Sequence, residues 1–276
     1  MSLKILIKGA GDLATGIAVR LYRAGYTIWM TDLKSPTAVR RTVSFSRCIY
    51  EGTAEVEGIT AEYAITADDG INISKRGRIA VFADPQAKII KEYKPDVLID
   101  AIIAKSNTGT SIDDAPFVIA AGPGFTAGID CHAVIETKRG HTLGSVITSG
   151  SAIANTGVPG NIGGYTTERI IRAAADGIFE PIAEIGSRVN KGDAVAKSGN
   201  ITIYAQLDGI VRGMLRDGTE VFKGMKCGDI DPRCERDNCF TVSDKARAIG
   251  GGALEAVCGY EHGTYPACSG EFSTIR

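Results

Sequence analysis

The stretch Ile5-Leu6-Ile7-Lys8-Gly9-Ala10-Gly11-Asp12-Leu13-Ala14-Thr15-Gly16 joins a short apolar run to a glycine-rich break, after which apolar residues resume at helical spacing. This pattern predicts a strand, a tight turn and a helix. In that context a Gly-x-Gly-x-x-Ala turn lets the backbone approach a pyrophosphate and directs the N–H groups of the helix N-terminus at it. The turn is therefore a candidate phosphate-binding loop, with the binding residues Gly9, Gly11, Asp12 and Ala14.

An acidic residue follows the second predicted strand at the spacing that nucleotide sites use. The strand Thr27–Thr31 ends at Asp32, about 20 residues past the glycines, where a carboxylate can accept hydrogen bonds from ribose hydroxyls. Arg40 and Arg41 either neutralise phosphates through bidentate contacts or form a solvated helix face, and both interpretations stay open. The glycine turn and Asp32 together predict a nucleotide site.

The composition limits the classes of partner. The chain has 276 residues, enough for one large domain or two ordinary ones, and Lys and Arg total 31 against 32 Asp and Glu. This balance lacks the basic field that nucleic-acid backbones require. No apolar run is long enough to cross a membrane, and no signal peptide is recognisable. Seven cysteines, an odd number, favour reduced thiols. We expect a soluble, cytoplasmic protein without nucleic-acid or membrane partners.

The first part of the chain alternates strand-like and helix-like segments. A helix is predicted at 85–93, and further strands at 60–66, 78–83 and 96–104. Residues 97–104 form a nearly continuous apolar run, which is typical of a parallel strand buried on both faces. The sequence predicts an α/β fold in which residues 1–172 form a Rossmann-like parallel-sheet domain that binds a nucleotide or cofactor.

A second glycine loop follows the predicted strand Phe117–Ala121, at the end where open α/β sheets bind ligands. We expect the two loops to face one site. Asp130, His132 and His141 could act as acid, base or metal ligand, but the spacing of the histidines matches no metal template, and no metal is predicted. Beyond the first loop, the candidate cofactor-binding residues are Asp32, Arg40, Arg41, Lys105, Gly122, Gly124, Gly128, Asp130 and His141. No catalytic residue is assigned.

An internal repeat begins after residue 172. The segment Asp176-Gly177-Ile178 matches Asp208-Gly209-Ile210, and a Gly-x-x-Val-x-x-Gly turn follows each copy at the same offset. This pattern resembles the two halves of biotinyl-lipoyl-like domains, so residues 173–232 are predicted to form a small all-β barrel-sandwich-like module. Lys197 lies near the position of a carrier lysine, but its neighbours differ from the usual flanking residues and modification is not expected.

The last part, residues 233–276, is predicted to be a loop and a helix that packs back on the first domain. The helix is expected at 244–258, with Gly250-Gly251-Gly252 near its start, where glycine permits close approach of another segment. The spacings of Cys227, Cys234 and Cys239 fit no zinc pattern, and their role is left open.

Several motifs together resemble one known family. They are Gly-Ala-Gly-Asp-Leu-Ala-Thr-Gly (9–16), Arg-Arg-Thr-Val-Ser-Phe-Ser (40–46), Gly-Pro-Gly-Phe-Thr-Ala-Gly-Ile-Asp (122–130), Val-Ile-Glu-Thr-Lys-Arg-Gly-His-Thr-Leu-Gly (134–144), Asn-Thr-Gly-Val-Pro-Gly (155–160), Gly-Asp-Ile-Asp-Pro-Arg (228–233) and Ser-Asp-Lys-Ala-Arg-Ala-Ile-Gly-Gly-Gly-Ala-Leu-Glu-Ala-Val (243–257). Through these motifs, the chain resembles the selenium-dependent molybdenum hydroxylase accessory family, which is related to the xanthine dehydrogenase accessory proteins. The resemblance extends from residue 4 to about residue 258. Cys131 departs from the apolar residue expected there.

The resemblance implies a maturation factor that binds a pyrophosphate-containing cofactor and assists its modification or insertion into a molybdenum hydroxylase client. The cofactor implied is a molybdopterin dinucleotide or NAD(P), which the sequence does not distinguish. Two alternatives from other classes are an NAD(P)-dependent oxidoreductase with a β substrate domain and a lipoyl- or biotinyl-like carrier or scaffold. A homo-oligomer is also compatible with the sequence.

Overall fold

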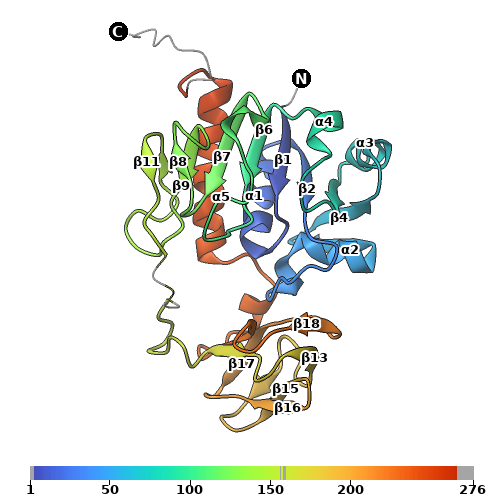
Figure 1. Ribbon diagram of the computed structural model, residues 1–276, viewed down its shortest axis with the longest axis vertical. Helices are drawn as coiled ribbons and strands as arrows, with labels where there is room; N and C mark the ends of the chain where they lie inside the picture. The colour runs from blue at the N-terminus through green and yellow to red at the C-terminus, as the bar shows by residue number, and fades with distance from the viewer. Residues whose placement is uncertain (1–2, 156, 158–159, 266–276) are drawn as a thin grey trace.

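The structure is a computed structural model, described for residues 3–155, 157 and 160–265. Thr156, Val158 and Pro159 of the 155–160 motif lie outside the described residues, as does Cys268. Figure 1 shows a larger α/β part above and a smaller β part below it. The chain passes from the α/β part into the β part and returns with its last helix to the α/β part.

The α/β part is built on a nine-stranded sheet with the order β10-β9-β7-β6-β1-β2-β5-β4-β3. The strand β1 lies at its centre and pairs in parallel with both β2 and β6. The strands are β1 Lys4–Lys8, β2 Thr27–Thr31, β3 Thr53–Val56, β4 Ile59–Ala64, β5 Ile79–Phe82, β6 Val97–Asp100, β7 Phe117–Ala121, β9 Ala133–Ile135 and β10 Val146–Ile147. A two-stranded sheet of β8 (Thr126–Ala127) and β11 (Gly150–Ser151) lies beside it.

The prediction of a Rossmann-like parallel sheet is wrong at both edges of the sheet, which are antiparallel. The strand β3 pairs antiparallel with β4, and β10 pairs antiparallel with β9. Glu57 and Gly58 form the two-residue connection between β3 and β4, and both have positive φ, 51° and 78°. Two residues can join only antiparallel neighbours, since a parallel connection needs a dozen or more. The sheet is therefore mixed.

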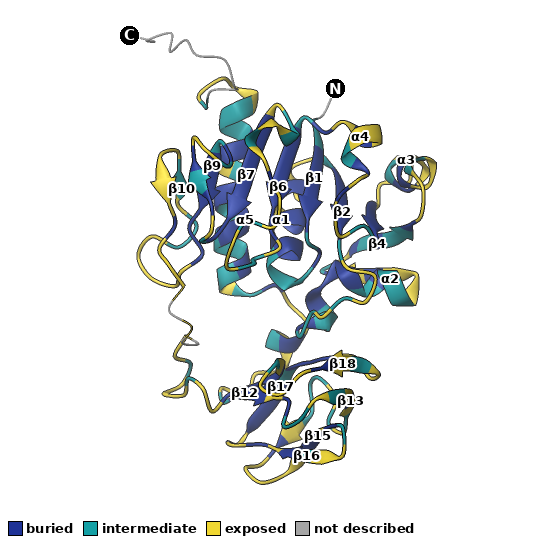
Figure 2. Cartoon of the chain, viewed as in Figure 1, coloured by how far each residue is buried: buried dark blue, intermediate teal, exposed yellow. Residues whose placement is uncertain are grey.

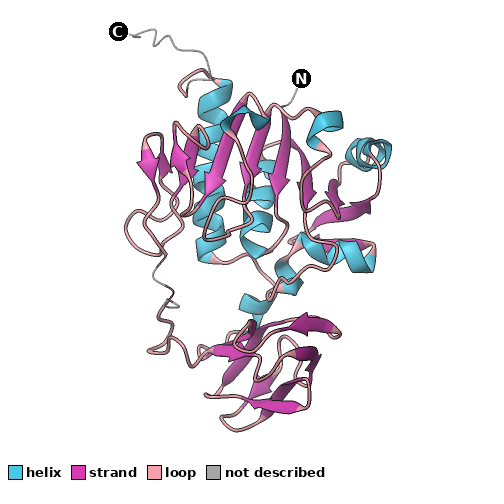
Figure 3. Ribbon diagram, viewed as in Figure 1, coloured by secondary structure: helices cyan, strands magenta, loops and turns pink. Residues whose placement is uncertain are grey.

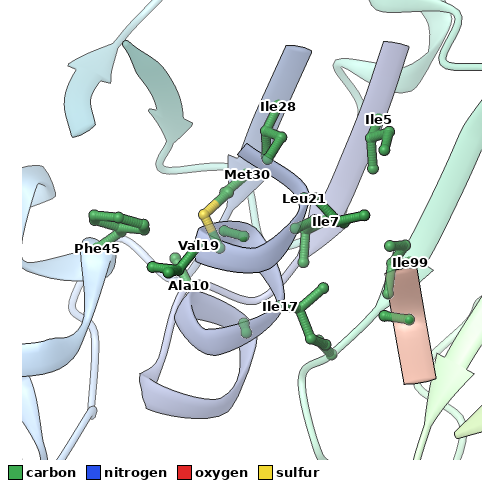
Figure 4. Close-up of a cluster of buried hydrophobic side chains, with 14 of the residues drawn as sticks. Ile5, Ile7, Ala10, Ile17, Val19, Leu21, Ile28, Met30, Phe45 and Ile99 are labelled. Atoms are coloured by element: carbon green, nitrogen blue, oxygen red, sulfur yellow. The ribbon is translucent and has the colours of Figure 1, made fainter. Parts of the chain in front are cut away.

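The side chains of the central strands alternate between two cores, one on each face of the sheet. Ile5 and Ile7 of β1 belong to the core shared with α1 and α5, whereas Leu6 belongs to the opposite core with Trp29. Figure 4 shows the strand residues of the first core beside Ile17 and Leu21 of α1. Figure 2 shows the central strands almost wholly buried. This double burial explains why the strands read as continuous apolar runs.

Five α-helices and four 3₁₀ turns are present in the described part of the chain (Figure 3). The helices are α1 Asp12–Arg23, α2 Cys48–Glu51, α3 Ala67–Lys75, α4 Ile90–Tyr93 and α5 Asp244–Glu261, and the 3₁₀ turns are η1 Arg41–Val43, η2 Phe45–Arg47, η3 Ile112–Asp114 and η4 Arg236–Cys239. The predicted helix at 85–93 is therefore confined to a single turn at its end. No helix in the described ranges combines the length and apolar character needed to span a bilayer.

The first and last helices pack closely through glycines. A Cβ added to Gly16 of α1 would lie 2.6 Å from the Cβ of Ala246 in α5, and one added to Gly250 would lie 2.6 Å from the carbonyl oxygen of Gly16. Near the other end of both helices, Tyr26 donates to Glu261, so the two helices run in parallel. The triple glycine thus lies inside α5 rather than at its start, although close approach is indeed what it permits.

The β part consists of two four-stranded antiparallel sheets, in the orders β12-β19-β17-β14 and β16-β15-β13-β18. Its strands are β12 Ile170–Arg172, β13 Gly177–Pro181, β14 Arg188–Val189, β15 Ala194–Ser198, β16 Ile201–Tyr204, β17 Gly209–Met214, β18 Thr219–Val221 and β19 Lys226–Asp231. The sequence repeat corresponds to β13 with β14 and β17 with β18. Each copy's first strand pairs with the second strand of the other copy. The domain boundary placed after residue 172 stays a prediction. The strand β12, which ends at Arg172, pairs with β19 on the other side of that boundary.

Candidate functional site

A cavity of about 330 Å³, called cavity 1 below, lies at the carboxyl ends of β1 and β2. It is lined by Gly9, Gly11, Asp12, Leu13, Thr31, Asp32, Leu33, Thr37, Ala38, Pro85, Ala101, Ile102 and Ile103. The structure therefore brings together Asp32 and three of the four first-loop residues singled out from the sequence. The fourth, Ala14, is buried in α1 instead.

Gly9 meets two structural requirements in this loop. Its φ is +93°, and a Cβ there would lie 2.8 Å from the carbonyl oxygen of Ala101. A side chain would thus be strained in its backbone conformation and would collide with the chain that leaves β6. Because glycine has no side chain, β1 and the loop after β6 can approach closely at the wall of cavity 1.

The start of α1 adds backbone donors to the same wall. Gly11 is its N-cap and supplies no side-chain hydrogen bond. The first N–H groups of an α-helix have no partner within the helix, and the aligned peptide dipoles make this end electropositive. Gly11, Asp12 and Leu13 all line cavity 1, so the cavity lies against an uncapped helix N-terminus.

Asp32 is held rigidly at the edge of cavity 1. Its Oδ2 accepts a hydrogen bond of 2.7 Å from the backbone N–H of Ala10, and its Oδ1 accepts one of 2.7 Å from that of Leu33. Burial raises the pKa of this carboxyl group, while the two backbone hydrogen bonds oppose the rise. Since each carboxylate oxygen has two acceptor positions, one on each oxygen is left for a ligand.

Apolar side chains form the rest of the cavity wall. Leu33 and Ile102 are 45% and 39% exposed, which is high for residues of their type. Both line cavity 1. The cavity therefore combines a carboxylate and helix amides with apolar surface suited to the carbon skeleton of a ligand.

A second cavity of about 330 Å³, cavity 2, adjoins cavity 1, since Ile103 lines both. Its lining includes the predicted residue Lys105 and is otherwise made of Ile103, Ala104, Pro123, Thr137, Lys138, Arg139, Ile153, Ala154, Asn155, Gly160 and Lys245. Lys138 and Arg139 follow β9, whereas Lys245 is the second residue of α5. Lys138, Arg139 and Lys245 are not among the candidate residues predicted from the sequence. The two adjacent basic residues Lys138 and Arg139, directly after a strand, could have indicated a site for an anion.

Arg40 and Arg41 line neither cavity. Arg40 is buried, with its Nη2 donating to the carbonyl oxygens of Asn238 at 2.7 Å and Thr241 at 3.1 Å. The Nε of Arg41 donates to the carbonyl oxygen of Met214 at 2.9 Å. The two arginines thus tie the α/β part to the β part and to the segment before α5.

The second glycine loop mainly shapes the backbone near cavity 2. Gly122 and Gly124 have positive φ, and a Cβ on Gly124 would lie 2.8 Å from the Cα of Ser106. Gly128 has a positive φ with open space around it. Asp130 accepts a hydrogen bond of 2.7 Å from the backbone N–H of Thr126, inside its own loop. None of these four residues lines either cavity.

His132, His141, Cys48 and Cys131 show no arrangement typical of a metal site or a reactive thiol. His141 is exposed and lines neither cavity. The Nδ1 of His132 accepts the backbone N–H of Val118 at 2.9 Å, and burial lowers its pKa. Burial raises the pKa of Cys48 and Cys131 to about 12. Within the described ranges, no group of three or more His, Cys, Asp or Glu side chains is arranged to hold a metal ion.

Comparison with curated proteins finds a relative in Escherichia coli (strain K12). The chain is 52% identical over 253 residues to a protein named "Uncharacterized protein YqeB". The alignment covers 92% of this chain but 47% of that protein, so the chain spans about half the length of the relative. No known protein-family profile matches the chain.

Among solved structures, similar chains come from aspartoacylases and related enzymes. An aspartoacylase family protein from Mesorhizobium loti has a TM-score of 0.28 at 12% identity, over 83% of this chain and 85% of that one. A succinylglutamate desuccinylase/aspartoacylase from Rhodobacter sphaeroides has a TM-score of 0.27 at 15% identity, with the same coverage. The ectoine utilization protein EutE from Ruegeria pomeroyi has 0.27 at 13% identity, over 83% and 86%.

These findings correct the expectations that followed from the sequence resemblance. None of the matched proteins is named as a molybdenum hydroxylase accessory factor or as binding a molybdopterin dinucleotide or NAD(P). The predicted selenium-dependent maturation role, its cofactors, and the Rossmann-like domain with a barrel-sandwich-like module are therefore wrong. With TM-scores this low, the likeness to the aspartoacylases carries neither a fold nor an activity to this chain.

Proposed function

We propose that the α/β part of this chain binds a small, hydroxyl-bearing molecule in cavity 1, with Asp32 accepting hydrogen bonds from its hydroxyl groups. The placement of Asp32 is the observation that carries this proposal. Two backbone N–H groups fix its carboxylate, and one acceptor position on each oxygen remains for a ligand. A carboxylate with two neighbouring free positions suits a pair of adjacent hydroxyls.

The surroundings of Asp32 support the same proposal. Leu33 and Ile102 offer exposed apolar surface for the carbon skeleton of the ligand. The uncapped start of α1 at Gly11 offers backbone donors for its oxygen atoms. A sugar or polyol has both features, a carbon skeleton and hydroxyls that can donate and accept.

The test is calorimetric or NMR titration of the protein with uncharged ribose as the probe. A hydrogen bond to a charged group contributes about 1.5–3 kcal/mol, so Asp32→Asn should weaken binding at least tenfold. Asp208→Asn is the matched control, because Asp208 also accepts a backbone N–H, that of Lys191 at 2.7 Å, but lies in the β part. The proposal fails if ribose does not bind, or if the two variants bind it equally well.

Two broader expectations remain proposals beside this one. We propose a cytoplasmic location, supported by the odd number of cysteines, and a homo-oligomeric state. Cell fractionation tests the first, and light scattering of the purified chain tests the second.

A further inference from the structure

We infer that cavity 2 is an oxyanion subsite, and that the ligand of cavity 1 extends into it with a phosphate or carboxylate group. The inference rests on the proposed function, since it treats the two cavities as parts of one site. It names the chemical class of the ligand: a hydroxylated carbon skeleton that carries an acidic group.

The lining of cavity 2 is strongly cationic. Lys105, Lys138, Arg139 and Lys245 reach it from three separate places in the fold, the loop after β6, the loop after β9 and the start of α5. No Asp or Glu is among its lining residues. Like charges gathered around one cavity repel each other, and an anion between them removes that cost.

The acidic groups nearby are already engaged. Asp244 forms a two-pronged ion pair with Arg139, with N–O distances of 2.5 and 2.9 Å. Glu136 is buried and accepts the backbone N–H groups of Lys138 at 2.7 Å and Ile153 at 2.8 Å. The side-chain ammonium groups of the three lysines form no hydrogen bond or ion pair with any residue that the structure describes. Three ammonium groups are thus left without a carboxylate in direct contact, although Asp12, Glu136 and Asp244 are near enough to attract Lys245.

Lys245 is the most informative of these lysines. Its side chain is half-buried, and burial, followed by repulsion from Arg139, lowers its pKa, while attraction from Asp12, Glu136 and Asp244 opposes the decrease. A partly desolvated ammonium without a directly contacting anion is less stable than one with such a contact, and a ligand could supply it. Its position at the second residue of α5 also places it at the electropositive end of an 18-residue helix, where an anion is favoured.

The two cavities are connected by a single residue in an unusual conformation. Ile103 has φ +60° and lines both cavities. Just before it, the backbone N–H of Ile102 donates to Asp100 at 3.1 Å, which fixes the chain at this point. One ligand passing over Ile103 would meet Asp32 on one side and Lys245 on the other.

The experiment compares three probes by titration: uncharged ribose, ribose 5-phosphate and gluconate. At least one of the two charged probes should bind tenfold or more tightly than ribose, and added NaCl should reduce this advantage. Lys245→Met should abolish the advantage, whereas Lys245→Arg should keep most of it. Lys75→Met, at an exposed lysine at the end of α3, should change nothing. The better charged probe tells whether the natural group is a phosphate or a carboxylate.

The outcomes separate this inference from the proposed function. If ribose binding depends on Asp32 but neither charged probe gains from Lys245, the subsite is refuted and the proposed function stands. If a charged probe depends on Lys245 but no probe depends on Asp32, the proposed function is refuted and cavity 2 remains an independent oxyanion site. Equal binding of both charged probes by the parent and Lys245→Met overturns the inference. Thermal unfolding of each variant confirms that it is folded.

Discussion

The ammonium group of Lys8 lies 3.7 Å from the carboxylate of Asp100, and both side chains are almost fully buried at the ends of the neighbouring strands β1 and β6. The hydroxyl of Thr110 lies between them, accepting from Lys8 at 2.5 Å and donating to Asp100 at 2.6 Å. Asp100 also accepts the backbone N–H of Ile102. This network anchors the loop that forms the wall between the two cavities.

Removing one member of this pair should destabilise the protein strongly. Lys8→Met leaves the buried carboxylate of Asp100 without its counter-charge, and we expect a loss of about 3–5 kcal/mol in the free energy of unfolding. The double variant Lys8→Met/Asp100→Leu should lose less, because no unpaired charge remains. The free energies of unfolding of both variants can be measured by urea titration. The fluorescence of Trp29, the single tryptophan, which is buried, reports the unfolding. A double variant less stable than Lys8→Met would contradict this account.

The glycines of α5 offer a comparison within one helix. Gly250→Ala should destabilise by about 1–3 kcal/mol, because its Cβ would lie 2.6 Å from the backbone oxygen of Gly16. Gly251→Ala should instead stabilise by up to about 1 kcal/mol, because nothing lies within 4 Å and alanine favours the helix. Denaturant titrations of the two variants give the comparison. Effects of the same sign would show that α1 and α5 do not pack as described.

Gly9 and Gly25 share a φ of +93° but differ in their surroundings. Gly25→Ala meets no atom within 4 Å and should cost only the backbone strain, about 1–2 kcal/mol. Gly9→Ala adds a collision with the carbonyl oxygen of Ala101, so it should cost distinctly more and also weaken ligand binding in cavity 1. Unfolding and ribose titrations of both variants isolate the contribution of the contact. Equal losses of stability would argue against a tight wall at Gly9.

The ion pair of Arg139 and Asp244 predicts a small acid dependence of stability. The hydrogen bonds from Arg139 hold the pKa of Asp244 well below its usual range. A carboxyl whose pKa is depressed by folding stabilises above its unfolded pKa of about 3.9, and the contribution is lost as pH falls below it. The side chains of Arg139 and Asp244 are 39% and 69% exposed, so we expect less than about 1 kcal/mol, reduced further by salt. Relative to Arg139→Gln, the parent should lose this amount between pH 5 and strongly acidic solution. Thermal unfolding across that pH range is the measurement, and parallel pH profiles would rule the contribution out.

The sequence allowed residues close together in the chain to be grouped in the candidate site, but not residues far apart. Gly9 and Asp32 could be placed beside one cavity because a glycine turn between strand and helix and an acid after the next strand have a fixed spacing. Lys245 could not, because it reaches the site only through the packing of α5 on α1, which joins residues far apart in the chain. Arg40 was ambiguous for the same reason, since its partners Asn238 and Thr241 are also distant.

For the fold as well, the sequence indicated local patterns but not the direction in which strands pair. The β-α-β alternation up to residue 105 and the internal repeat were visible as patterns of neighbouring residues. The antiparallel edges were missed because the apolar runs do not report strand direction, although the short Glu57-Gly58 turn contained that information. The prediction drawn from family resemblance was wrong, whereas the placement of Gly9, Gly11 and Asp32 did not depend on that resemblance.

The packing of α5 on α1 has a consequence for the order of folding during synthesis. The core on that face of the sheet needs Ile249, Ala253 and Val257 as well as residues of β1, so we expect it to stay open until the ribosome has released Glu261. The β part has all its strands by Asp231. The β part should thus acquire its native structure before the α/β part that precedes it in the chain, with the nascent α/β sheet exposed to chaperones in the interval.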